Sequence, residues 1–187
     1  MTLEPVSLAI SITTTIIGII GGSFAVMTYL KNQRLQRQAI ILPLMKEFDT
    51  DMRLDAARRL LEGFKYIPEG QGHAFDKDGL NTLLRNHRKS TDSRIDPAEL
   101  KVRESFVALL DFFGKLGYLL DIKVITKKEL GYFKWYIYKA RNDANINTFA
   151  KTYSFELYAV LLNKMDALPE TLRDLSKRYY DNERSDS

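Results

Sequence analysis

The first thirty residues contain one long apolar run. No charged residue lies between positions 5 and 30, and at 1.5 Å per residue the part from Val6 onward would form a helix about 37 Å long. A helix of that length crosses a bilayer. A cleaved secretory signal has a basic start and a shorter apolar core, whereas this chain begins with Glu4 and no Lys or Arg. The pattern therefore predicts a retained transmembrane anchor over residues 1–30.

Positive charges follow this run at once. Lys31, Arg34 and Arg37 would stand at the inner end of the anchor, which is where basic residues gather in membrane proteins. We expect the amino terminus outside and everything after the anchor in the cytoplasm. Residues 31–44 are expected to form a basic juxtamembrane helix beside the anionic headgroups of the lipid bilayer.

Small and bulky side chains fall on opposite faces of the anchor when its residues are placed at intervals of about 100°. The small-residue face consists of Ser7, Ser11, Thr14, Thr15, Gly18, Gly22 and Ala25. Gly18 and Gly22 form a GxxxG pair, which lets helix backbones approach closely. Gly and Ser are also common in membrane helices that do not associate, so two interpretations stand, and we favour association into a homo-oligomer. A ring of such chains, with Ser and Thr turned inward, would line a pore.

Helical spacing of apolar residues continues along the rest of the chain. It is found in residues 51–62, 80–84, 97–120, 127–141 and 149–165, and again after Pro169. No segment shows the sustained alternation that is typical of strands. We therefore predict an all-α fold class, with a cytoplasmic helical bundle over residues 45–180 and a polar tail over 181–187.

Two capping patterns mark helix starts in this bundle. Asp96, Pro97 and Glu99 form the first, and Thr126 with Glu129 forms the second. The helix after Asp96 should supply the centre of the core through seven apolar positions: Val102, Phe106, Leu109, Leu110, Phe113, Leu116 and Leu120. The helix after Thr126 carries aromatic residues on several faces. We expect it to be buried on two sides, in the core or at a protomer interface, rather than to stack on nucleic-acid bases.

Composition restricts the available chemistry. The 187 residues include no cysteine and two histidines, His73 and His87, which lie apart in the sequence. Without cysteine there is no thiolate nucleophile, and two separate histidines provide few ligands for a zinc centre and few candidates for a Ser-His-Asp triad. The sequence also has no phosphate-binding glycine loop, no HExxH motif and no calcium loop. The net charge of +4 permits contact with phosphates without requiring it. We expect a non-enzymatic protein without a cofactor or a metal.

One motif remains at the end of the aromatic helix. Arg141 and Asn142 resemble the start of the Arg-polar-x-x-x-His signature of HEPN domains, which are small helical proteins, many of which cut RNA across a dimer interface. The resemblance implies a HEPN-like bundle and, as an alternative function, RNA binding or cleavage. Asn147 is one of the residues that stand where the histidine would be sought. Asparagine does not titrate, so the motif is degenerate and we expect no catalytic residue. A helix end with a C-terminal cation and a turn former is an equally good interpretation of Arg141 and Asn142.

Two wider resemblances concern the whole chain. The order of anchor, basic junction and the helices LLDFFGKLGYLL and ITKKELGYFKWYIYKARND is similar to a family of uncharacterised bacterial single-span helical membrane proteins. With the degenerate motif, it also resembles the small membrane accessory proteins encoded beside the RNA-targeting effector of type VI-B CRISPR loci. The second resemblance implies an oligomer that perturbs the bacterial inner membrane in antiviral defence, with a CRISPR effector complex or RNA as partners. A passive membrane scaffold that recruits a cytoplasmic partner is the remaining hypothesis.

Overall fold

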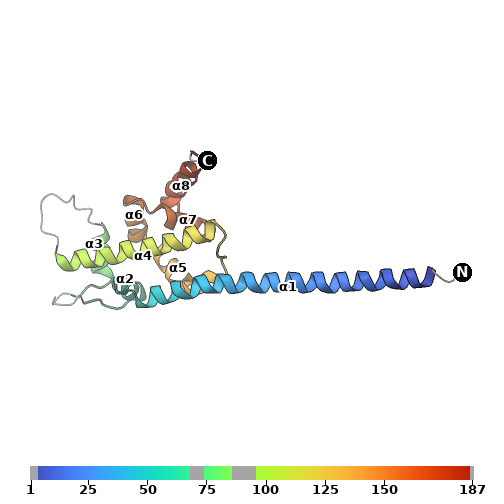
Figure 1. The fold of residues 1–187 in the computed structure, drawn as a ribbon. Coiled ribbons are helices and arrows are strands. Elements are labelled where there is room, and N and C mark those ends of the chain that lie inside the picture. Colours follow the sequence, from blue (N-terminus) through green and yellow to red (C-terminus); the bar gives the residue numbers. More distant parts are fainter. Residues whose placement is uncertain (1–3, 68–73, 86–95, 186–187) are drawn as a thin grey trace. The chain divides into compact units, whose positions relative to one another are not determined.

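The computed structural model describes residues 4–67, 74–85 and 96–185, without the side chains of residues 4–17, 77, 82, 85 and 183–185. The chain forms two compact units, Met1–Leu42 and Pro43–Ser187, and each is described by itself. Figure 1 follows the chain from its amino terminus in blue to its carboxyl terminus in red.

The first unit consists of helix α1, which spans Glu4–Thr50 and so also supplies the first turns of the second unit. Among the described residues, no helix combines the length and the apolar character that a membrane crossing needs. In α1 the described apolar side chains, residues 18–30, extend over about 20 Å before Lys31. This finding corrects the predicted fold class: the transmembrane anchor over residues 1–30 is not supported, whereas the all-α prediction is confirmed.

The second unit contains the other helices. They are α2 (Met52–Glu62), α3 (Lys77–Arg85), α4 (Pro97–Asp121), the 3₁₀ helix η1 (Glu129–Tyr132), α5 (Lys134–Arg141), α6 (Ala144–Thr152), α7 (Glu156–Lys164), the 3₁₀ helix η2 (Glu170–Leu172) and α8 (Arg173–Ser185). An isolated antiparallel bridge joins Tyr66 to Phe75. No strand occurs in the described ranges of the chain.

Helix α4 forms the centre of the second unit, and it packs mainly against α7 and α2. It begins as its sequence predicts, because the Asp96 carboxylate accepts a hydrogen bond from the Ala98 N–H at 3.0 Å and Pro97 occupies the first turn. All seven predicted core positions of this helix are buried. The capping pattern and the apolar spacing therefore predicted both its start and its buried face.

Two glycines let α7 lie directly against α4. A Cβ atom at Gly117 would stand 2.3 Å from the Leu157 backbone oxygen, and one at Gly114 would stand 3.1 Å from the Leu157 Cβ. No side chain fits at the first position without displacement of the α7 backbone. The glycine pair therefore sets how closely the two central helices approach.

Two predicted helices are interrupted in the structure. The segment 149–165 is divided between α6 and α7, because Ser154 has a φ of 56° and leaves the helical conformation. In the segment 127–141 the Glu129 carboxylate does accept from the Thr126 N–H at 2.7 Å, but a 3₁₀ turn precedes α5. The predictions of single continuous helices were wrong there, although the second cap is present.

The aromatic helix α5 is buried on one side rather than two. Phe133 and Ile137 are fully buried, whereas Trp135 remains 46% exposed. The Tyr136 hydroxyl donates a hydrogen bond to Glu62 Oε1 at 2.5 Å, and burial together with this carboxylate raises the pKa of Tyr136 to about 12. The prediction of burial on two sides was therefore wrong for the face that carries Trp135.

Candidate functional site

The described part of α1 carries large apolar side chains that are exposed to solvent. Five of them have exposed fractions between 57% and 72%: Ile19, Ile20, Phe24, Met27 and Leu30. At about 100° per residue these five positions fall within an arc of about 140°, on the side of the helix opposite Gly18, Gly22 and Ala25. An apolar face of this width normally packs against other groups.

The small-residue face of α1 is described only in part. The side chains of Ser7, Ser11, Thr14 and Thr15 lie outside the described residues. At Gly18 and Gly22 an added Cβ would meet nothing within 4 Å, and Ala25 is exposed. This part of the predicted association face is therefore open in a single chain.

The basic residues after the apolar run are at the surface of α1. Lys31 and Arg34 are exposed and Arg37 is half-buried. None of the three forms an ion pair with another residue that the structure describes. Their charges remain available to an anionic group of another molecule.

The degenerate motif residues come together at the turn between α5 and α6. The Arg141 Nε–H donates to the Ala167 carbonyl oxygen at 2.9 Å, and Nη1 donates to Asn142 Oδ1 at 2.9 Å. Asn147 Nδ2 donates in turn to the Arg141 carbonyl oxygen at 2.7 Å. These bonds join the end of α5 to α6 and to the segment before η2, so the three side chains stabilise a turn.

Two buried polar atoms near this turn have no hydrogen-bond partner among the described groups. They are Asn147 Oδ1 and the Tyr158 hydroxyl. Burial raises the pKa of Tyr158, and the Asp143 carboxylate contributes in the same direction. A tyrosine held neutral in this way does not act as a base near neutral pH. His73 and His87, the remaining candidates for imidazole chemistry, lie outside the described residues.

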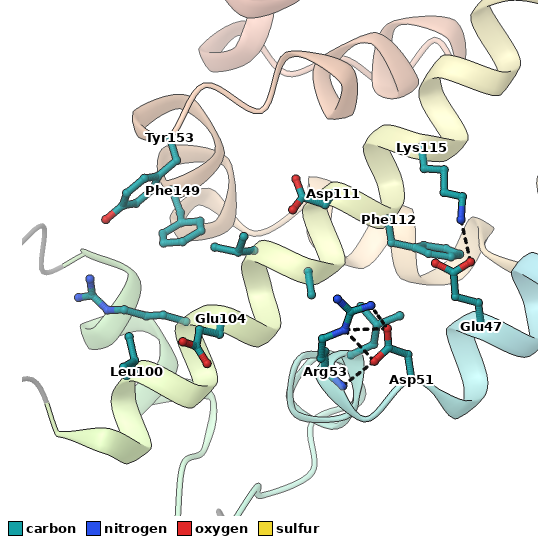
Figure 2. A pocket seen from close by; sticks show the side chains of 14 residues that line it. Glu47, Asp51, Arg53, Leu100, Glu104, Asp111, Phe112, Lys115, Phe149 and Tyr153 are labelled. Carbon is teal, nitrogen blue, oxygen red and sulfur yellow. Dashed lines mark hydrogen bonds and ion pairs between the residues drawn. The ribbon is translucent and has the colours of Figure 1, made fainter.

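The second unit has a groove of about 600 Å³ over the outer face of α4, between α2 and α6 (Figure 2). We call it the α4 groove. Its apolar lining comes from Leu54 of α2, from Leu100, Val107, Ala108 and Phe112 of α4, and from Phe149 of α6. Leu100 is 44% exposed and Val107 is 36% exposed. The groove therefore presents apolar side chains to solvent along one side of the central helix.

Two ion pairs stand on the α2 side of the α4 groove. Lys115 Nζ lies 2.8 Å from Glu47 Oε2, and Arg53 Nη2 lies 2.6 Å from Asp51 Oδ2. Asp51 also accepts from the Arg53 N–H at 2.9 Å and so caps α2. The hydrogen bond from the Arg53 side chain lowers the pKa of Asp51. The charges of these four side chains are therefore neutralised in pairs.

Two further carboxylates line the groove without such partners. Glu104 and Asp111 lie seven positions apart on α4, and no described group bonds to either side chain; Figure 2 shows both of them without a dashed line. Partial removal from water raises the pKa of Asp111. The groove therefore has an apolar floor, two carboxylates outside its ion pairs, and one further cation, Arg103, whose Nη2 donates to the Leu83 carbonyl oxygen at 2.9 Å.

The α4 groove was not predicted from the sequence. Leu100 and Val107 lie outside the predicted core stripe of α4 but share helical spacing with each other. This second apolar face on one helix was the signal from which the groove could have been predicted. Nothing in the sequence showed that α2 and α6 would form its walls.

Within the described ranges, no group of three His, Asp or Glu side chains is placed to hold a metal ion. Comparisons with known proteins produced no match: no protein-family model fits the chain, and neither a curated protein nor a solved structure matches it. The resemblances to HEPN domains and to CRISPR accessory proteins therefore stay predictions.

Proposed function

We propose that this protein is a non-enzymatic scaffold that self-associates through α1. The observation that carries the proposal is the exposure of large apolar side chains along one face of α1, with Phe24 72% and Met27 69% exposed. Removing such surface from water is the main favourable term in protein association. The small-residue face lies on the opposite side of α1, so one neighbouring helix covers only one of the two faces and further copies are needed to cover both.

The small residues of α1 favour close contact between the copies. Gly18 and Gly22 leave open space where another backbone fits, and Ala25 continues the same face. Close approach increases the number of dispersion contacts between neighbouring helices. We therefore place the tightest contact of the assembly on this face.

The turn at Arg141 supports a non-enzymatic role. The Arg141 guanidinium is engaged with the Ala167 carbonyl and with Asn142, rather than directed at an open site with a titratable partner. The resemblance to CRISPR accessory proteins associates such an assembly with antiviral defence, and this association remains a prediction.

Cysteine crosslinking in cells tests the proposal, because the chain has no cysteine of its own. Ala25→Cys in the full chain should give a covalent dimer on oxidation. A double variant, Ala25→Cys with Met27→Cys on the opposite face, should give a ladder of larger species because each chain then bonds two neighbours. Asn163→Cys, at an exposed position of α7, is the matched control and should stay monomeric.

The mass of the purified full chain provides the independent check. A single-chain mass over the whole concentration range, together with no crosslink at Ala25→Cys, would refute self-association. A crosslink at Met27→Cys alone would show that the bulky face, rather than the small-residue face, makes the contact.

A further inference from the structure

We infer that the α4 groove is a docking site for a basic amphipathic helix of a partner protein. The inference rests on the second unit alone and is independent of self-association through α1. The groove combines exposed apolar side chains, walls from two other helices and two carboxylates that form no ion pair with a described group.

The dimensions of the groove match a short helix. Its α4 residues run from Leu100 to Lys115, a distance of about 22 Å at 1.5 Å per residue, which is the length of about fifteen helical residues. Helices that bind in grooves insert apolar side chains at positions i, i+3, i+4 and i+7. Leu100, Val107 and Phe149 provide apolar contact for such a face.

Charge selects the kind of helix. The ion pairs Glu47–Lys115 and Asp51–Arg53 are internally neutral, and Arg103, which also lines the groove, donates from Nη2 to the Leu83 carbonyl oxygen at 2.9 Å. The lining therefore has four carboxylates and three cations, a net charge of −1, and Glu104 and Asp111 are the two carboxylates outside its ion pairs. A partner with two Lys or Arg residues seven positions apart places a positive charge opposite each carboxylate. An acidic helix would instead bring like charges together and would be rejected.

A peptide-binding experiment with the full chain tests this inference. The probe is a synthetic amphipathic peptide of about sixteen residues, with Leu on one face, two Lys seven positions apart at the edge of that face and a fluorescent label for anisotropy. The first comparison peptide carries Glu in place of both Lys. The second has the composition of the probe in an order without an apolar face. Only the probe should bind, and added salt should weaken its binding because the charges are exposed.

Variants of the protein connect the binding to the groove. Neutralising both carboxylates with Glu104→Gln and Asp111→Asn should raise the Kd of the probe about fivefold to tenfold at low salt, in line with two exposed ion pairs. Val107→Glu should abolish binding, because it places a charge on the apolar floor. Tyr118→Glu is the matched control, since Tyr118 is 45% exposed on the same helix but does not line the groove.

The outcomes separate the occupants of the groove. Equal binding of the basic and acidic peptides, or full binding by Val107→Glu, overturns the inference. If the probe fails to bind while Val107→Glu lowers the mass of the assembled full chain, the groove is an interface between copies, which also overturns it. Binding of the probe alone, lost in Val107→Glu and kept in Tyr118→Glu, supports it whether or not the chain self-associates.

Discussion

Replacing Gly117 with alanine adds one methyl group at the closest contact between the two central helices. The new Cβ atom would lie 2.3 Å from the Leu157 backbone oxygen and 3.1 Å from the Leu161 Cβ. Carbon atoms contact carbonyl oxygens at about 3.3 Å or more, so α7 has to move away from α4 by about 1 Å. The nearest atom belongs to the backbone of a packed helix, so a change of side-chain rotamer cannot relieve the contact.

The expected loss of stability is the difference between two terms. Overpacking of a core costs about 1–3 kcal/mol, and the upper part of this range applies because a helix backbone is displaced. Alanine also favours the helix over glycine by about 1 kcal/mol. The net loss is therefore about 2 kcal/mol, which corresponds to a fall in Tm of about 4–8 °C for a unit of this size.

Two other glycines provide matched controls for this variant. At Gly114 the nearest atom is the Leu157 Cβ at 3.1 Å, a contact that a much smaller shift of α7 relieves, and at Gly131 nothing lies within 4 Å. Gly114→Ala should lower the Tm less than Gly117→Ala does, and Gly131→Ala should leave the Tm unchanged or slightly raised. Urea and thermal unfolding of the full chain, followed by far-UV circular dichroism, measure all three. A Gly117→Ala variant as stable as Gly131→Ala would show that α7 does not approach α4 this closely.

Three further predictions concern association, pH and the motif turn. Gly22→Ile, in open space within one chain, should weaken crosslinking through Ala25→Cys without changing the unfolding of the second unit. Ile20→Leu, on the bulky face, should leave both the crosslinking and the unfolding unchanged. Equal crosslinking in the two variants would show that the small-residue face is not part of the interface. The raised pKa of Asp111 means that the folded state binds its proton more tightly than the unfolded state, so stability falls as pH rises through these pKa values. Asp111→Asn should therefore raise the Tm at neutral pH, and this gain in Tm should disappear at pH values below the ordinary pKa of 3.8. A gain in Tm that persists in acid would show that it does not come from the raised pKa of Asp111. Arg141→Ala should lower the free energy of unfolding by about 1–2 kcal/mol, because the buried Ala167 carbonyl loses its donor, and purified wild-type protein should cleave no RNA; RNA cleavage that this substitution abolishes would restore the enzymatic hypothesis.

Local signals in the sequence determined which parts of the second unit are helical and which face of the central helix is buried. The Asp96 carboxylate and Pro97 act within their own helix turn, and the spacing of Val102, Phe106 and Leu109 depends only on helix geometry. Such information does not depend on the remainder of the chain. The same holds for the absence of cysteine, which excludes thiol chemistry from the sequence alone.

Contacts between distant segments decided the rest. The helix breaks at Ser154 although the sequence has no proline or glycine there. Beyond this break, α7 packs closely against the glycine face of α4. Trp135 is exposed although its neighbours Phe133 and Ile137 are buried, because only one side of α5 meets other helices. The α4 groove needs residues from α2, α4 and α6 at once. Periodicity shows that a residue lies on an apolar face, but whether a neighbouring helix covers that face depends on packing that one segment does not encode.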